Sequence, residues 1–281
     1  MKTRQEIKAY AKQTFMAQYS NSVLALFLVL LLTTGFALIS ATTSIFNSLP
    51  HLRNAGIMTM SSGQFILINT VIPLISIPVS ILTMVLSVNL CGVFVKVYYG
   101  QQIIAAEPYH ALKFNFGRKL GGMFWEILWI YLWALVGIFT LFIPTVIKAL
   151  SYSMTPYILA NNPNVTATDA LSLSKRMTNG HKGEIFVMYL SFFGWQLLNM
   201  LTLGILGIFY VNPYMYTSLA GLFVELRNTA VVTGVIHPQE LDGIQQYYYQ
   251  QPAYPAAQPY DQPPPPPPPP APPAPPDNEN N

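Results

Sequence analysis

Charged side chains are scarce in this chain, and they are missing in long blocks. Only 9% of the 281 residues are charged and 52% are hydrophobic, whereas a soluble domain has about 25% charged residues. The charge-free blocks lie between Lys12 and Arg53, Arg53 and Lys96, Glu126 and Lys148, and Glu184 and Glu225. Each block contains an apolar run of the ~20 residues that a bilayer crossing needs. This lack of charge argues against a soluble globular protein and predicts a multi-pass membrane protein.

Cysteine is almost absent, since the chain has one, Cys91, within an apolar run. A single thiol excludes an internal disulfide and a cysteine zinc site, and we expect it to be a small buried apolar residue. The four histidines are scattered, and no HExxH, GxSxG or phosphate-loop motif is present. The sequence therefore predicts no metal, no cofactor and no catalytic residue, and we expect a protein that is not an enzyme.

Basic residues are missing from the end of the chain, because all 14 Lys and Arg lie at or before Arg227. They gather beside the apolar runs, in residues 2–12, 96–122 and 161–184. Basic segments next to spans tend to stay in the cytoplasm, so this distribution indicates membrane orientation and no nucleic-acid partner. We expect a protein of the cell (cytoplasmic) membrane, surrounded by the lipid bilayer, with both termini cytoplasmic.

Residues 1–21 are expected to form an amphipathic helix in the cytosol or at the membrane interface. Ile7, Ala11 and Phe15 recur at four-residue spacing, and Lys8 and Lys12 lie off that face. A basic amphipathic segment before a span is typical of a helix on the membrane surface. A plain cytosolic extension of the first span is the alternative.

Residues 22–232 are predicted to form an all-α transmembrane bundle of six spans. The spans are expected at residues 22–45, 65–95, 123–142, 143–160, 185–209 and 213–232. Residues 123–160 are too long for one crossing and just long enough for a hairpin that breaks near Gly137 and Pro144; with a single crossing here the bundle has five spans. Six are preferred because they place all three basic segments on one side. The last two spans are expected to meet at a turn near Asn212-Pro213.

A short cytosolic helix is predicted between the fourth and fifth spans. Thr166 and Asp169 match a capping box, in which hydroxyl and carboxylate groups satisfy free amides at a helix start. Asn179-Gly180 matches a helix stop. The helix is expected to pack on the cytosolic face of the bundle.

The composition changes abruptly from Tyr247, and an unbroken proline run extends from Pro263 to Pro270. Residues 233–281 are therefore predicted to be a cytosolic linker and a disordered tail that favours polyproline II. Such a run can dock into an aromatic groove of a protein partner. An unstructured solubilising end is the alternative.

Two groups of residues are candidate functional sites. Ionisable side chains at span edges usually face protein, water or the interface, so one hypothesis is an ion-paired cluster made from Lys96, Glu126, Glu225 and Arg227. The other is a turn that could hold a lipid phosphate, formed by Gly180, His181, Lys182 and Gly183. The alternatives are separate snorkelling side chains for the first group and a flexible basic turn for the second. Gly117 and Gly121 match GxxxG, but two basic residues separate them, so we expect a loop there.

Several short strings carry a resemblance to a known family. They are Ser153-Met-Thr-Pro-Tyr157, Ala170-Leu-Ser-Leu-Ser174, Gly180-His-Lys-Gly183 and Asn212-Pro-Tyr214, with Glu6-Ile-Lys8 near the start. Over roughly residues 4–230 the chain resembles the bacterial membrane family catalogued as domain of unknown function 975. The resemblance implies a multi-pass membrane protein and supplies no activity or catalytic residue.

Two functions are compatible with these features. The first is a non-enzymatic protein that assembles with or regulates other envelope components, with the cytosolic helix and the tail as contact surfaces. The alternative is a small-molecule or lipid transporter, because transporters often break helices at the substrate site and the second and fourth spans contain proline.

Overall fold

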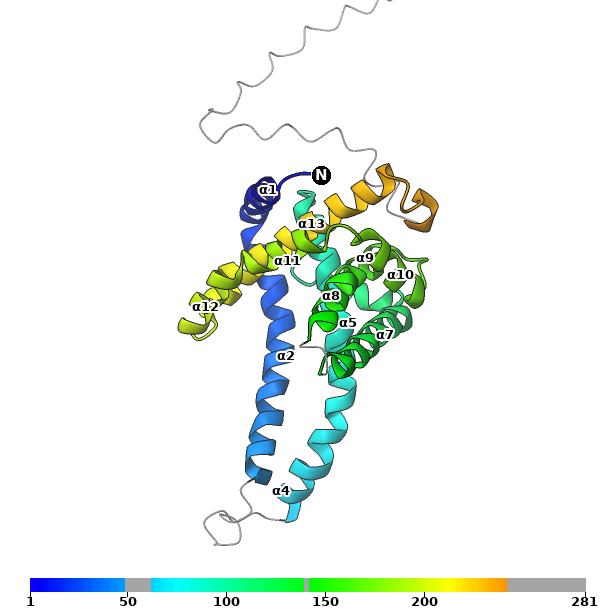
Figure 1. Cartoon of the computed structure of the whole chain (residues 1–281). Helices are drawn as coiled ribbons and strands as arrows, with labels where there is room; N and C mark the ends of the chain where they lie inside the picture. The colour runs from blue at the N-terminus through cyan, green and yellow to red at the C-terminus, as the bar shows by residue number, and fades with distance from the viewer. Residues whose placement is uncertain (49–61, 139–141, 242–281) are drawn as a thin grey trace, which may run out of the picture.

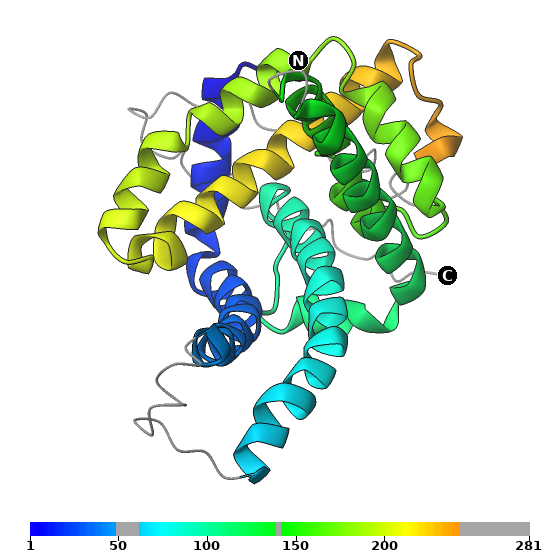
Figure 2. The ribbon, with the colours of Figure 1, turned by 60° about the horizontal axis from the view of Figure 1, so that its bottom comes forward.

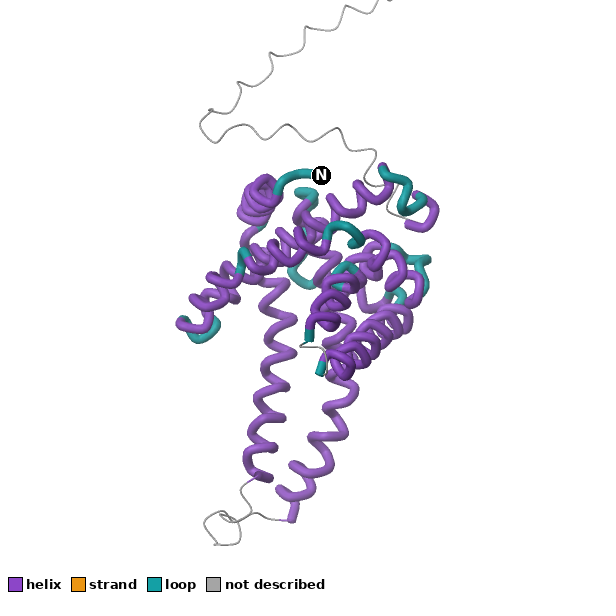
Figure 3. The backbone as a smooth tube through the Cα atoms, in the orientation of Figure 1, coloured by secondary structure: helices purple, strands orange, loops and turns teal. Residues whose placement is uncertain are grey.

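The computed structural model describes residues 1–48, 62–138 and 142–241, and all regular structure within these ranges is helical (Figure 3). The α-helices are α1 Arg4–Ala17, α2 Tyr19–Ser48, α4 Ser62–Ile66, α5 Ile72–Tyr98, α6 Glu107–His110, α7 Phe116–Gly137, α8 Ile143–Tyr152, α9 Thr155–Asn161, α10 Ala167–Met177, α11 Lys182–Leu190, α12 Phe193–Leu201 and α13 Asn212–Val232. Two π-helices, η1 Leu67–Val71 and η3 Gly207–Val211, and two 3-10 helices, η2 Ala111–Lys113 and η4 Pro238–Leu241, complete the fold. The all-α prediction is confirmed for the described residues.

The helices form a body from which one long hairpin projects. Helices α2 and α5 run side by side out of the body, and α4 lies at the far end of the hairpin (Figure 1). Within the body, α13 lies across the C-terminal half of α5, as Figure 2 shows from a second direction. Helices α1, α7 and α9 also pack on α5, so this half of α5 is the centre of the core.

The N-terminal helix is separate from the first long helix. Thr3 caps α1 through a capping box with Glu6, and Ile7, Ala11 and Phe15 are buried, as the four-residue spacing predicts. The chain then bends by 91° between α1 and α2. Residues 4–17 therefore form a helix of their own with a buried apolar face, and its place in the cytosol or at the membrane interface stays a prediction.

Both π-helices lie directly before a proline. Pro73 is the second residue of α5, after η1, and Pro213 is the second residue of α13, after η3. Proline has no N–H to donate and its ring crowds the carbonyl four residues earlier, so a wider turn relieves both problems. The expected turn near Asn212-Pro213 is therefore wrong, because the helix continues through Pro213. The chain reverses earlier, where Leu203 and Gly204 have φ values of 51° and 87°.

Residues 123–160 contain the predicted break. Helix α7 ends at Gly137, Phe142 has a φ of 60°, and Pro144 lies in the first turn of α8. Helices α7 and α8 then pack together, and the Thr145 hydroxyl donates to the carbonyl of Trp133 at 2.8 Å. The return is divided into α8, of 10 residues, and α9, of 7 residues.

The start of α7 corrects the expectation of a loop at Gly117 and Gly121, since both glycines are helical. The helix accommodates the two basic residues between them, because Arg118 donates to carbonyl oxygens at the end of α9 and Lys119 is hydrogen-bonded in the interior. Close packing begins at the next glycine, Gly122. A Cβ at Gly122 would lie 2.3 Å from a methyl carbon of Leu159 in α9. Glycine therefore lets the two helices approach each other more closely than any larger residue would.

Among the described residues, three helical segments are long and apolar enough to cross a membrane: Ile72–Tyr98, Phe116–Gly137 and Lys182–Leu201. A fourth is possible if the bent pair Arg4–Ala17 and Tyr19–Gly35 forms one span. The count of six spans is not confirmed. Residues 233–241 pack on the body, with Ile236 and Leu241 buried, so this part of the predicted linker is folded. The proline run lies outside the described residues.

Candidate functional site

Helix α7 has a polar buried stripe and apolar exposed faces. Its buried residues include Lys119, Gly122 and Glu126, which follow one helical face. Tyr131 and Leu135 on its other faces are 71% and 64% exposed. A helix on a soluble protein has the opposite arrangement, with its apolar stripe facing the core. The arrangement in α7 is the one expected of a helix whose outer faces contact lipid.

Lys119 is held inside the body by neutral oxygen atoms. Only 5% of the residue is exposed, and its Nζ donates to Oδ1 of Asn89 at 2.6 Å and to the carbonyl of Ala111 at 3.2 Å. The Nδ2 of Asn89 in turn donates to the carbonyl of Pro108 at 2.8 Å. This network connects α5, α7 and the α6–η2 segment. It also supplies the hydrogen bonds that a buried cation requires, because removing a cation from water is costly.

Arg118 binds the C-terminal end of α9. Its guanidinium donates to the carbonyl oxygens of Asn162 at 2.5 Å, Val165 at 3.1 Å and Leu159 at 3.4 Å. The last carbonyls of a helix lack intrahelical partners and carry partial negative charge, so a cation there is favourable. Arg118 is thus a structural clamp on α9, a role that sequence reasoning missed because it placed this residue in a loop.

Glu126 is the buried acid of the same stripe. It is 9% exposed, and its Oε2 has no hydrogen-bond partner among the described residues. It lies within electrostatic reach of Cys91 on α5 and Tyr189 on α11. An ionisable group inside a span marks a candidate functional site, because burying it is expensive and needs a reason.

The predicted cluster of Lys96, Glu126, Glu225 and Arg227 is not confirmed. Lys96 pairs with Glu107. Glu225 accepts from the backbone N–H of Lys2 at 3.1 Å and lies 3.6 Å from the Nζ of Lys2. Arg227 donates to the Tyr99 hydroxyl at 2.9 Å and to Oδ1 of Asn228 at 2.7 Å. Lys96, Glu225 and Arg227 thus have three different sets of partners, and Glu126 lies apart from them in the stripe of α7.

The predicted turn at Gly180, His181, Lys182 and Gly183 joins α10 to α11. Helix α10 begins after Thr166 and ends at Met177, as predicted, and Gly180 has a φ of 85° that favours glycine. The Nδ1 of His181 lies 3.3 Å from Oε1 of Glu184, so the imidazole already has an acidic neighbour. Gly183 borders the cavity described next.

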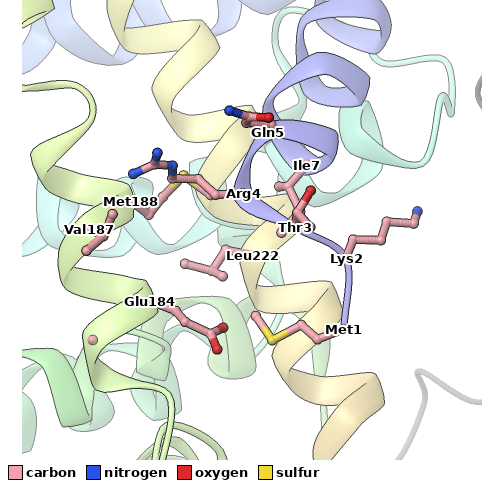
Figure 4. Close-up of a pocket in the computed structure, with 11 residues that line it drawn as sticks. Met1, Lys2, Thr3, Arg4, Gln5, Ile7, Glu184, Val187, Met188 and Leu222 are labelled. Atoms are coloured by element: carbon pink, nitrogen blue, oxygen red, sulfur yellow. The ribbon is translucent and has the colours of Figure 1, made fainter. Parts of the chain in front are cut away.

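A cavity of about 600 Å³ lies between the N-terminal segment, α11 and α13 (Figure 4). Its inner wall is apolar, with Ile7, Met188 and Leu222 each 1% exposed. Lys2, Arg4 and Glu184 are the charged residues around it. Sequence reasoning did not predict this cavity, because it forms between segments that lie far apart in the chain.

An ion pair with α10 anchors the C-terminal end of the described chain. Arg176 of α10 pairs with both carboxylate oxygens of Glu240, at 2.7 and 3.1 Å, and also donates to the carbonyl of Val235. The backbone N–H of His237 donates to Glu240 at 2.8 Å. The hydrogen bond from Arg176 lowers the pKa of Glu240 and raises that of Arg176. We call Arg176, Val235 and Glu240 the C-terminal clasp.

The described residues contain no group of three His, Cys, Asp or Glu side chains that could hold a metal ion. The fold and site thus define a class: an all-helical protein with several helices able to span a membrane and ionisable side chains in its interior. The model of a family described as protein of unknown function (DUF975) matches residues 55–230, so the chain belongs to this family. No curated protein and no solved structure matches the chain.

Proposed function

We propose that this protein is a multi-pass protein of the cytoplasmic membrane with six crossings and both termini in the cytoplasm. The supporting observation is the polar buried stripe and apolar outer surface of α7. Six helical segments correspond to the proposed crossings: α2, α4–α5, α7, α8–α9, α11–α12 and η3–α13. Helix α13 is shielded by other helices, so it need not be apolar enough to face lipid.

Cysteine labelling tests this topology. Cys91 is replaced by alanine, and single cysteines are introduced as Asn54→Cys, between α2 and α4, and Asn164→Cys, between α9 and α10. A membrane-impermeant thiol reagent should label Asn54→Cys in intact cells and Asn164→Cys only after permeabilisation. Labelling of Asn164→Cys in intact cells would contradict the orientation.

We further propose that the protein is not an enzyme and acts by assembling with or regulating other envelope components. The supporting observation is the C-terminal clasp, which anchors the chain just before the tail to α10. Helix α10 lies within the basic segment of residues 161–184, which the proposed topology places in the cytoplasm. A tail anchored at a fixed point is suited to present its proline run to a partner on that side.

Cross-linking followed by affinity purification tests this proposal. The full chain is compared with a chain that ends at Leu241 and with a matched full-length control in which residues 263–270 are serine. The full chain should capture a defined envelope protein that both variants lose. Equal capture by all three forms would contradict a role for the proline run.

Transport of a small molecule or lipid is the second candidate function. The observation that favours it is Glu126, a buried carboxylate with an oxygen that lacks a hydrogen-bond partner among the described residues. If Glu126 takes up and releases protons during transport, proteoliposomes with the wild-type protein should dissipate an imposed pH gradient faster than Glu126→Gln proteoliposomes. Equal rates would argue against this function.

A further inference from the structure

We infer that the cavity between the N-terminal segment, α11 and α13 binds a membrane phospholipid with an anionic headgroup. This inference rests on the proposed membrane location and is independent of the proposed partner. The cavity of about 600 Å³ falls within the ~300–1,000 Å³ typical of small-ligand sites. Three features of the described residues support it: the apolar wall, the basic rim and the position at the start of a candidate span.

The apolar wall suits an acyl chain. Ile7 of α1, Met188 of α11 and Leu222 of α13 form the inner surface, and each is 1% exposed. Val187, also at the cavity, is 40% exposed. Its neighbour Phe186 and, one turn further along α11, Leu190 are also exposed. An acyl chain can therefore leave the cavity along an apolar helix face. A free phosphate ester has no apolar chain that could be buried against such a wall.

The rim favours an anion. Lys2 and Arg4 border the cavity, and Glu184 is the one carboxylate among its lining residues. Glu184 already lies beside His181, at 3.3 Å, and Lys2 lies beside Glu225. The exposed Arg4 has no side-chain hydrogen bond or ion pair among the described residues. A free guanidinium can bind two phosphate oxygens at once, which makes Arg4 the principal headgroup ligand.

The position of the cavity matches the level of lipid headgroups. Its α11 residues are Gly183, Glu184, Val187 and Met188, within the first two turns of the candidate span Lys182–Leu201. Basic residues at the start of a span lie near the membrane surface. The headgroup would therefore meet Arg4 at the interface while a chain extends along α11 toward the bilayer.

Lipid binding is measured on the full chain in detergent, by native mass spectrometry and by the shift in unfolding temperature. Phosphatidylglycerol, phosphatidylcholine and glycerol 3-phosphate are the three probes. We expect phosphatidylglycerol to bind and raise the unfolding temperature, phosphatidylcholine to bind at least tenfold more weakly, and glycerol 3-phosphate to have no effect. Equal binding of the two lipids, or binding of glycerol 3-phosphate alone, would overturn the inference.

Matched variants locate the site. Arg4→Gln should weaken phosphatidylglycerol binding by about tenfold, because one charge-assisted contact is lost. Lys12→Gln, on the same helix and away from the cavity, should bind as the wild type does. Val187→Trp fills the mouth of the cavity and should also weaken binding. Unchanged binding by Arg4→Gln and Val187→Trp would overturn the assignment.

A chain that ends at Leu241 separates this inference from the proposed partner function. We expect it to keep its full affinity for phosphatidylglycerol while losing the partner. Loss of lipid binding in this shortened chain would contradict the location of the site, since the tail is not part of it.

Discussion

Helices α7 and α13 have similar lengths but opposite surroundings, since α7 is mostly exposed and α13 is mostly buried. Helix α7 is a candidate span whose apolar 18-residue stretch is 11% buried, and the few buried positions of the helix include Lys119 and Glu126. Helix α13 is not among the candidate spans. Most of its residues are buried, and Phe223 and Leu226 are both 0% exposed. Of these two helices, the candidate span is thus the one with more exposed surface. A helix covered by other helices can carry polar residues, because its neighbours supply the partners.

The largest effect should come from breaking the close packing of α13. A Cβ at Gly221 would lie 2.3 Å from Cε2 of Tyr98 and 2.9 Å from Cγ2 of Ile7, both buried. We expect Gly221→Ala to lower the free energy of unfolding by about 3 kcal/mol, the upper end of the usual cost of overpacking. Denaturant unfolding in detergent measures it.

Gly117→Ala is the matched control, since nothing lies within 4 Å of its added Cβ in α7. It should leave stability unchanged or raise it slightly, because alanine favours helix. Equal losses in the two variants would show that α13 is no more tightly packed than the start of α7.

The next effect concerns the hydrogen-bonded cation in α7. Lys119→Met leaves Asn89 and the carbonyl of Ala111 without their donor. We expect a loss of about 2 kcal/mol in the free energy of unfolding, the usual penalty for buried polar atoms left without a partner. Asn89→Leu combined with Lys119→Met should recover part of this loss in a double-mutant cycle. A neutral effect of Lys119→Met alone would refute the network.

Glu126 should behave differently from Lys119 although both lie in one stripe. Its Oε2 makes no hydrogen bond to the described residues, so Glu126→Gln removes an ionisable group and no such contact. We expect the free energy of unfolding to change by less than about 1 kcal/mol, or to rise. The same denaturant experiment measures this change. A loss as large as that of Lys119→Met would mean that the carboxylate has a partner in the membrane-embedded protein.

The smallest effect is the pH dependence of the C-terminal clasp. The pKa of Glu240 is lowered in the folded state by Arg176, so the clasp contributes stability above the pKa of Glu240 in the unfolded chain. That contribution is lost as the pH falls through the folded-state pKa. Because the side chain of Glu240 is 35% exposed, the effect should stay below about 1 kcal/mol.

Hydrogen exchange of residues 233–241 between pH 7 and pH 3 measures this loss. Protection should fall with acidification in the wild type. It should be low and less dependent on pH in Glu240→Gln. An unchanged wild-type profile would indicate that the clasp does not hold the segment.

Local patterns in the sequence predicted local structure well. The spacing of Ile7, Ala11 and Phe15 identified the buried face of α1, and Thr166 with Gly180 located α10 and its ends. These predictions succeed because periodicity and capping act within a few residues. The proline rule failed at Pro213, since a π-helix before the proline accommodates it without a turn.

The candidate sites were harder to predict, because they depend on distant parts of the chain. Arg4 and Met188 meet at one cavity only after α1 packs beside α11 and α13. Lys119 and Glu126 are seven residues apart, which places them on one helical face, and this signal was available. It was missed because the charges of residues 118 and 119 indicated a loop, whereas the folded chain buries or binds both.

The proposed membrane location requires that the exposed apolar faces of α7 contact lipid. A spin label attached through Tyr131→Cys, in a Cys91→Ala background reconstituted into vesicles, tests it directly by relaxation with oxygen and with a water-soluble nickel complex. We expect strong relaxation by oxygen and weak relaxation by nickel at residue 131, with the reverse at the control Asn164→Cys. Strong relaxation by nickel at residue 131 would place this face of α7 in water and rule out its contact with lipid.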